Sequence, residues 1–179
     1  MIILVGASAS GKTEVAKRLK QLFGTKKVVT HTTRSPREGE INHVDYHFVS
    51  EEEFDKLKNE GAFVETTLYN GHHYGTSKKE IADDKVLIVD PQGLVHFKSL
   101  NDPRIVAFFM DASRRTRRQR MIQRGDDPKA ANERINTDDE KFNLRTVTNY
   151  DFIIDAETQT IQEVACRVYE LYAQKISLI

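Results

Sequence analysis

Eight consecutive residues near the start of the chain combine glycines, small side chains, a lysine and a hydroxyl. They are Gly6, Ala7, Ser8, Ala9, Ser10, Gly11, Lys12 and Thr13, and they fit the pattern G-x-x-x-x-G-K-[ST]. Glycines at these places let the backbone wrap around a polyphosphate, so that successive N–H groups point at its anionic oxygens. We therefore predict a nucleoside triphosphate site, with Lys12 on the terminal phosphates and the Thr13 hydroxyl on Mg²⁺.

The sequence on both sides of this run suits a phosphate-binding loop. The apolar segment 2–5 precedes it and predicts a buried strand of a parallel sheet. The segment 13–23 has apolar residues at helical spacing and is followed by Gly24, which predicts a helix that ends there. A pattern of this length also occurs by chance, but the strand before it and the helix after it favour a nucleotide site.

A single acidic residue, Asp90, follows the apolar segment 85–89, which predicts another buried strand. A carboxylate at the end of such a strand would orient a water molecule bound to Mg²⁺. The alternative is that Asp90 is a turn residue in front of Pro91. The residues by themselves leave both interpretations open.

Two arginines lie in a polar segment beyond the first helix, and a tyrosine follows that segment a few residues later. This segment is Thr30-His-Thr-Thr-Arg34-Ser-Pro-Arg37-Glu-Gly-Glu40, with Asp45-Tyr46-His-Phe48 soon after it. Taken alone, such a segment is typical of a solvated loop. Together with the glycine-rich run, it resembles the guanylate kinase family. Later matches in family order are Gly61-Ala-Phe63-Val-Glu65, Tyr74-Gly75-Thr76, Asp90-Pro-Gln92-Gly93 and Arg120 to Gly125, so that the resemblance extends over essentially the whole chain.

The resemblance implies a binding site for guanosine monophosphate (GMP). The residues that match this site are Thr30, Arg34, Arg37, Tyr46, Glu65, Tyr74, Thr76 and Asp90. Guanidinium forks suit phosphate oxygens, and tyrosine hydroxyls donate hydrogen bonds without adding charge. Glu65 matches the carboxylate that reads guanine through N1–H and the N2 amine, a pair of donors that adenine lacks. The alternative for Glu65 is a solvent-facing strand residue.

Arginines are concentrated between residues 114 and 124, where Arg120 and Arg124 share one face of a predicted helix. The residues that match the family's catalytic set are Lys12, Arg120, Arg124 and Arg134. Positive charge of this kind neutralises the group that moves in phosphoryl transfer. We expect Arg114, Arg115 and Arg118 to form a solvated basic face. Ile88 departs from the family, which commonly has an acidic residue there in addition to the one at Asp90.

Short apolar segments alternate with amphipathic ones along the chain. We expect strands over 2–5, 27–30, 45–49, 62–69, 72–74, 85–89, 104–110 and 151–154, with a type I′ turn at Asn70-Gly71. We expect helices over 13–23, 50–59, 113–124 and 161–172, with 128–148 mostly helical. This pattern indicates a three-layer α/β/α P-loop NTPase core with a parallel sheet.

Two segments are expected to stand apart from this core, as an antiparallel acceptor-binding insertion and a short lid. The expected division is core 1–30, insertion 31–77, core 78–124, lid 125–138 and core 139–179.

The composition argues against several other classes of protein. Basic and acidic residues balance at 27 each, which gives no reason to expect nucleic acid or a membrane as a partner. No apolar run approaches the roughly 20 residues that a membrane-spanning helix needs. Cys166 is the only cysteine, which suits a reducing cytoplasm. We expect a cytoplasmic monomer or homodimer whose partners are small nucleotides.

The combined interpretation is a phosphotransferase that uses ATP and Mg²⁺ to convert GMP or dGMP to GDP or dGDP. One alternative is a kinase that acts on a different small phosphorylated acceptor. A less favoured alternative is a non-enzymatic guanylate kinase-like binding module. Such modules typically lack the loop lysine and the lid arginines, whereas this chain has Lys12, Arg120 and Arg124.

Overall fold

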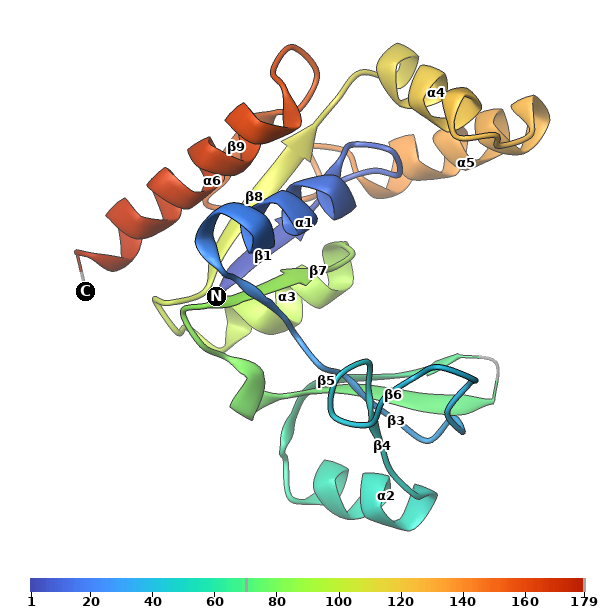
Figure 1. The fold of residues 1–179 in the computed structure, drawn as a ribbon, viewed down its shortest axis with the longest axis vertical. Helices are drawn as coiled ribbons and strands as arrows, with labels where there is room; N and C mark the ends of the chain where they lie inside the picture. Colours follow the sequence, from blue (N-terminus) through green and yellow to red (C-terminus); the bar gives the residue numbers. More distant parts are fainter. Residues whose placement is uncertain (70, 179) are drawn as a thin grey trace.

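A computed structural model describes residues 1–69 and 71–178 of the chain (Figure 1). The strands are β1 (Ile2–Val5), β2 (Lys26–Lys27), β3 (His31–Thr32), β4 (His47–Phe48), β5 (Phe63–Tyr69), β6 (His72–Ser77), β7 (Lys85–Ile88), β8 (Val106–Asp111) and β9 (Phe152–Asp155). The helices are α1 (Lys12–Phe23), α2 (Glu51–Asn59), α3 (Pro91–Ser99), α4 (Arg114–Gln123), α5 (Pro128–Lys141) and α6 (Ile161–Ile176), with a 3₁₀ turn η1 (Lys78–Glu80).

The main sheet has five parallel strands in the order β2-β7-β1-β8-β9. Helices cover both of its faces, because side chains of a strand point alternately to opposite sides. Ile2 and Leu4 of β1 pack with α1 and α6, whereas Ile3 and Val5 pack with α3. The predicted three-layer α/β/α core with a parallel sheet is confirmed. In such sheets, ligands bind beyond the carboxyl ends of the strands.

A second sheet of four strands in the order β4-β3-β6-β5 is built from the segment between β2 and β7. Strand β6 pairs antiparallel with both β3 and β5, whereas β3 and β4 run parallel. The expectation of an antiparallel insertion is therefore wrong for the β3–β4 pair. Helix α2 covers this sheet through Phe54, which is fully buried and stacks on Phe63. The Ser50 side chain accepts from the Glu53 amide and caps α2, as its sequence predicts.

Two predicted elements end earlier than expected. The segment 27–30 is not one strand, because the chain passes from the main sheet to the second sheet there: the Val28 amide bonds the Val86 carbonyl, and the Thr30 carbonyl accepts from His47. Helix α5 ends at Lys141, short of residue 148. Beyond it Asn143 forms a turn, with its side chain accepting from Arg145 and its carbonyl from Thr146. The expected turn at Asn70-Gly71 lies partly outside the described residues.

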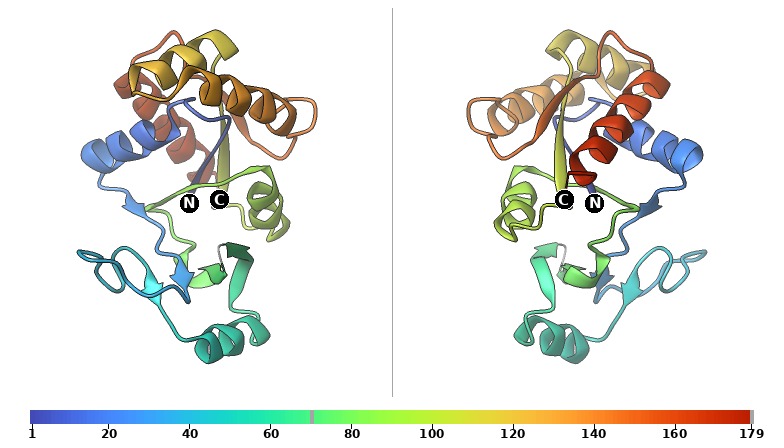
Figure 2. Two further views of the ribbon diagram at one scale, coloured as in Figure 1. Left: turned by 90° about the vertical axis from the view of Figure 1, so that its right-hand side faces the viewer. Right: turned by 90° about the vertical axis from the view of Figure 1, so that its left-hand side faces the viewer.

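The second sheet and the pair of helices α4 and α5 project from opposite ends of the core, and both reach toward the same side in Figure 1. Figure 2 shows the same separation from two further directions, with α4 and α5 at the top and α2 at the bottom. The carboxyl ends of the parallel strands lie between these two projections. No helix in residues 1–69 and 71–178 is long and apolar enough to cross a membrane.

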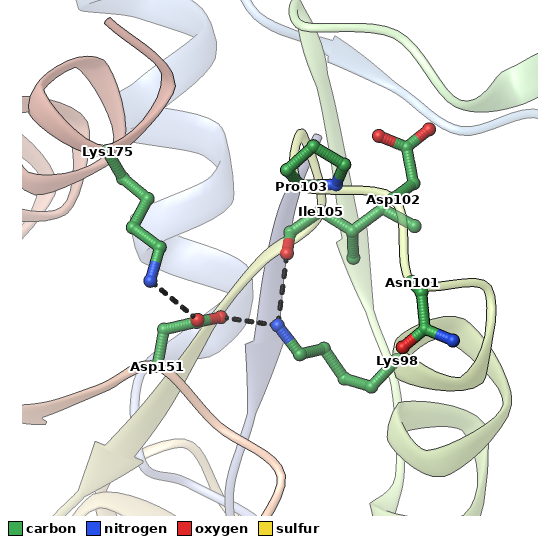
Figure 3. A pocket seen from close by; sticks show the side chains of 7 residues that line it. All are labelled: Lys98, Asn101, Asp102, Pro103, Ile105, Asp151 and Lys175. Carbon is green, nitrogen blue, oxygen red and sulfur yellow. Dashed lines mark hydrogen bonds and ion pairs between the residues drawn. The ribbon is translucent and has the colours of Figure 1, made fainter. Parts of the chain in front are cut away.

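A cluster of charged side chains ties the last helix to the amino-terminal end of the sheet (Figure 3). Asp151 accepts from Lys98 at 2.8 Å, from Lys175 at 3.2 Å and from the Ala107 amide at 2.8 Å. Burial works against the charged carboxylate, but these hydrogen bonds outweigh it and hold the pKa of Asp151 below its ordinary value. The adjoining hollow of about 310 Å³ lies away from the carboxyl ends of the strands, and its charges already have partners. We assign it a structural role.

Candidate active site

The glycine-rich loop follows β1 directly and turns sharply into α1. A Cβ on Gly6 would lie 2.6 Å from the Met110 carbonyl oxygen of β8, so that only glycine allows the loop to pass this close to the neighbouring strand. Ala9 has a φ of 60°, an uncommon left-handed conformation for a residue with a Cβ. Helix α1 begins at Lys12 and ends at Gly24, whose amide bonds the Lys20 carbonyl. The loop and helix therefore have the geometry that the sequence predicts.

Lys12 folds back over the loop that precedes it. Its ammonium donates to the carbonyls of Gly6 and Ala7 at 2.6 and 2.7 Å. Burial lowers the pKa of Lys12 to about 8, against an attractive effect of the Asp138 carboxylate. The lysine is therefore a partly desolvated cation at the mouth of the loop.

Helices α4 and α5 bring the three predicted arginines to the loop. Arg120 donates to the Ala9 carbonyl at 3.3 Å, and Arg134 donates to the Ser8 hydroxyl at 2.8 Å. Arg124 forms an ion pair with Asp126 at 2.6 Å. A hollow of about 460 Å³, which we call the loop hollow, is lined by Ala9, Gly11, Lys12, Thr13, Glu14, Arg120, Gln123, Arg124 and Ile161.

The second sheet brings together most of the side chains expected on an acceptor phosphate. The rings of Tyr46 and Tyr74 lie edge to face with centroids 6.2 Å apart, and the Arg34 guanidinium lies 5.4 Å from the Tyr46 ring. Arg34 is paired with Glu40 at 2.8 Å, and this bond raises the pKa of Arg34. Arg37 is exposed in the adjoining loop, where its backbone amide donates to Glu40 at 2.7 Å.

Glu65 owes its direction to an irregularity in β5. The strand shifts register between Phe63 and Glu65, so that Phe63 pairs with Ser77 and Glu65 pairs with Thr76. Such a bulge re-aims the side chain that follows it. Glu65 consequently faces α3, where its Oε2 lies 3.2 Å from the position that a Cβ on Gly93 would occupy.

Burial is the main cause that raises the pKa of Glu65, and the neighbouring Asp90 acts in the same direction. The His96 ring and the Thr76 hydroxyl oppose this rise.

Three neighbouring hollows lie between the loop and Glu65, and each shares a lining residue with the next. The loop hollow shares Thr13 with a middle hollow of about 560 Å³, which Thr30, Tyr46 and Ile88 also line. The middle hollow shares Ile88 with a Glu65 hollow of about 300 Å³, which Asp90 and His96 also line. The predicted acceptor residues Thr30, Tyr46, Glu65 and Asp90 therefore line hollows next to the one at the phosphate loop. Arg34, Arg37, Tyr74 and Thr76 line none of these three hollows.

Comparison with known proteins decides the family. The family model described as guanylate kinase matches residues 1–172. The chain belongs to the guanylate kinase family.

Individual guanylate kinases give the same result. A guanylate kinase of Helicobacter pylori is 32% identical over 163 residues, which are 86% of this chain and 78% of that protein. One of Schizosaccharomyces pombe is 41% identical over 106 residues, or 55% of this chain and 52% of that protein. The crystal structure of guanylate kinase from Anaplasma phagocytophilum has a TM-score of 0.64 at 25% identity, covering 98% of this chain and 85% of that one. The matches span 52%, 65% and 64% of the first three curated relatives.

Sequence reasoning about this guanylate kinase family member missed three residues near the site. Asp138 is buried, and its Oδ2 accepts from the Ser8 amide of the loop at 2.6 Å. Arg117 is also buried and bonds Asp139 and the Ala112 carbonyl. His96 lies beside Glu65. The sequence gives little sign of any of them, because each depends on how a helix turns relative to a distant segment.

Asp90 has structural contacts at the start of α3. Its side chain accepts from the Gly93 amide at 2.8 Å and caps α3, and it accepts from Lys141 at 2.9 Å. Burial opposes ionisation, but these bonds outweigh it and lower the pKa of Asp90. The interpretation of Asp90 as a residue of the strand–helix turn therefore describes its contacts, and its carboxylate still lines the Glu65 hollow.

Proposed function

We propose that this chain transfers the γ-phosphoryl group of ATP to the phosphate of GMP or dGMP, forming ADP and GDP or dGDP. The single observation that carries this proposal is the series of three neighbouring hollows, each of which shares a lining residue with the next. The series begins at the phosphate loop with Lys12 and Thr13, passes Tyr46 and ends at Glu65. Two nucleotides would meet through their phosphates in the middle hollow. The base of one would then lie toward the loop hollow and the base of the other toward the Glu65 hollow.

The acceptor residues support a purine monophosphate with guanine as its base. Arg34, Tyr46 and Tyr74 converge in the second sheet, and all three side chains suit phosphate oxygens. Glu65, supported by Thr30, Thr76 and Asp90 nearby, would accept the two parallel N–H donors of guanine. Adenine presents an acceptor at N1 in place of one donor, which would leave the carboxylate unpaired.

The reaction needs no covalent enzyme intermediate. An oxygen of the acceptor phosphate forms a bond to the γ-phosphorus while the bond from that phosphorus to the oxygen bridging to the β-phosphate breaks, and ADP leaves. Lys12, Arg120, Arg124 and Arg134 would neutralise the transferred group. Arg34 and Arg37 would hold the acceptor.

Several donors that would bind substrate phosphates are paired with carboxylates of the protein. Asp138 holds the Ser8 amide, Asp126 holds Arg124 and Glu40 holds Arg34. These carboxylates sit where anionic phosphates would bind the same donors. Accordingly, we propose that residues 31–77 and 125–138 move as an acceptor-binding insertion and a lid, which would exclude water when both substrates are bound.

The residues present fit Mg²⁺ that is held largely by substrate phosphates and water. Among the described residues, no group of three or more acidic, histidine or cysteine side chains could hold a metal ion alone. Mg²⁺ commonly takes one or two protein ligands and completes its shell with phosphates and water. The exposed Thr13 hydroxyl at the start of α1 would hold the ion, and Asp90 would act through a bound water. The ion would neutralise charge on the β- and γ-phosphates.

A cytoplasmic location and a monomeric or homodimeric state belong to the same proposal. The lone Cys166 suits a reducing compartment.

A kinase that acts on a different phosphorylated acceptor is the second candidate, because Ile88 places an apolar side chain in the acceptor space where the family commonly has an acidic one. Its side chain is 39% exposed and lines both the middle hollow and the Glu65 hollow. An apolar group there accepts no hydrogen bond from a sugar hydroxyl or from a water molecule bound to an ion. Turnover of CMP or UMP well above that of GMP and dGMP would favour this candidate.

A coupled assay of ADP release tests the proposal with GMP, dGMP, AMP, CMP and UMP as acceptors. We expect turnover with GMP or dGMP and at least 10²-fold lower kcat/KM with AMP, on the order of the discrimination that a mismatched polar group produces. Equal use of AMP and GMP would remove the role proposed for Glu65. Binding of nucleotides without turnover of any acceptor would favour a non-enzymatic module.

A further inference from the structure

A histidine outside the expected acceptor set lies against Glu65. His96 is on α3, and its Nδ1 is 3.8 Å from Oε2 of Glu65. This Nδ1 is buried and has no hydrogen-bond partner among the described residues, although the His96 side chain as a whole is 42% exposed. The ring therefore turns a polar atom inward toward the carboxylate.

The other groups around Glu65 do not supply a positive charge. Asp90, at the start of α3, is a like charge, and its own partner Lys141 neutralises it in part. Thr76, on the neighbouring strand β6, carries only a hydroxyl. His96 is consequently the one cationisable side chain that pairs with Glu65 in the part of the chain that the structure describes.

We propose that His96 is a positioning residue for Glu65, which keeps its carboxylate ionised and directed at the acceptor base. This inference rests on the proposed function, because it concerns the same base-reading site. His96 acts through Glu65 and is assigned no contact with the reacting atoms.

The chemistry requires such a partner because Glu65 reads guanine only as a carboxylate. A protonated carboxyl group would present its own O–H to a guanine donor and lose one of the two parallel hydrogen bonds. Burial raises the pKa of Glu65, and Asp90 adds to that rise. An imidazolium close by favours the ionised form and so extends guanine recognition to lower pH.

The expected effect follows from the separation of the two groups. Two unit charges about 4 Å apart interact by about 1 kcal/mol at a solvent-like dielectric, which corresponds to about 0.7 pH unit. We use this screened value because both side chains are partly exposed. Removing the positive charge should move the acidic limb of kcat/KM for GMP upward by about 0.7 pH unit, or about a fivefold loss on that limb.

The test compares wild type with His96→Phe, His96→Gln and His96→Lys between pH 5 and pH 8.5. We expect the first two variants to lose about fivefold in kcat/KM for GMP on the acidic limb and to match wild type within about twofold at pH 8.5, far from that limb. His96→Lys should restore the acidic limb, because it returns the positive charge. His73→Phe is a matched control, since His73 faces Glu51 at a similar 3.7 Å.

A second measurement needs no turnover. Carbon-13 NMR measures the titration midpoint of the Glu65 carboxyl group in protein without nucleotide. The Glu65 resonance is identified as the carboxyl signal that is missing from the spectrum of Glu65→Gln. The midpoint should rise in His96→Phe and return in His96→Lys. An unchanged midpoint, or an equal loss of activity at pH 5.5 and pH 8.5, would overturn the inference. Absence of GMP turnover by wild type would instead contradict the proposed function, and the NMR titration would still decide the role of His96.

Discussion

Lys12 should destabilise the nucleotide-free protein even though nucleotide binding requires it. Its ammonium is largely buried against the loop, and burial lowers its pKa from 10.5 to about 8. A folded-state pKa below the unfolded value means that the unfolded chain binds this proton more tightly. The resulting penalty on folding is complete below pH 8 and disappears as the pH rises from about 8 to about 10.5.

The size of this effect follows from the shift in pKa. At about 1.4 kcal/mol for each pKa unit, the penalty is about 3 kcal/mol at pH 7 and falls below about 1 kcal/mol by pH 10. Lys12→Met removes the penalty but also leaves the Gly6 and Ala7 carbonyls without their donor, at about 1 kcal/mol each. The two effects nearly cancel at pH 7. At pH 10 only the lost hydrogen bonds remain, so that the variant should be the less stable protein by about 1–2 kcal/mol.

Urea denaturation at pH 7, 8, 9 and 10 without nucleotide measures the free energy of unfolding of wild type and Lys12→Met. The wild-type value should rise relative to the variant by about 2 kcal/mol across this range. Lys17→Met is the matched control, since Lys17 is exposed on the same helix and, among the described residues, has an ion pair with Glu14 alone. ATP should raise the stability of wild type but not of Lys12→Met. Parallel stability curves for wild type and Lys12→Met would refute the assignment of Lys12 as a buried cation.

Three further substitutions test the phosphate loop, the contacts of helices α4 and α5, and the recognition of guanine by Glu65. Gly6→Ala should destabilise the protein by about 3 kcal/mol in thermal melts, because its Cβ would meet a backbone carbonyl of β8 at 2.6 Å. Gly24→Ala is the control, since Gly24 also has a positive φ, 69°, but nothing lies within 4 Å of its Cβ position, and it should cost only about 1 kcal/mol. Asp139→Asn should cost about 1–2 kcal/mol in urea denaturation, because it leaves the buried Arg117 with a weaker partner. Glu65→Gln should lower kcat/KM for GMP by about 10²-fold while ATP binding stays within about twofold; equal losses in both would indicate misfolding.

Several elements defined by local patterns were predicted from the sequence with nearly correct bounds, whereas helix α3 and strand β3 were not expected. The phosphate loop, the start and end of α1 and the capping of α2 by Ser50 all depend on residues a few positions apart. The alternation of apolar strands and amphipathic helices gave the parallel sheet. The segment 27–30 was predicted wrongly, because its pattern does not reveal that the chain changes sheets between Val28 and Thr30.

The candidate site was predictable only in part, because several of its contacts join distant segments. Arg34, Tyr46 and Glu65 were found through the family resemblance. The structure places Tyr46 and Glu65 in neighbouring hollows and Arg34 beside the Tyr46 ring. The bulge that turns Glu65 toward α3 arises from strand pairing, which no local pattern encodes. The contact of Asp138 with the loop amide likewise spans 130 residues.

The affinity of a ligand that joins adenosine and guanosine through a chain of phosphates tests the central claim most directly. If two nucleotides bind face to face between the phosphate loop and the second sheet, this ligand should bind at least about 10²-fold more tightly than ATP or GMP alone in calorimetry with Mg²⁺. Both Lys12→Met and Arg34→Met should weaken the binding of this ligand. Binding no tighter than that of ATP alone, or binding indifferent to Arg34→Met, would contradict the account.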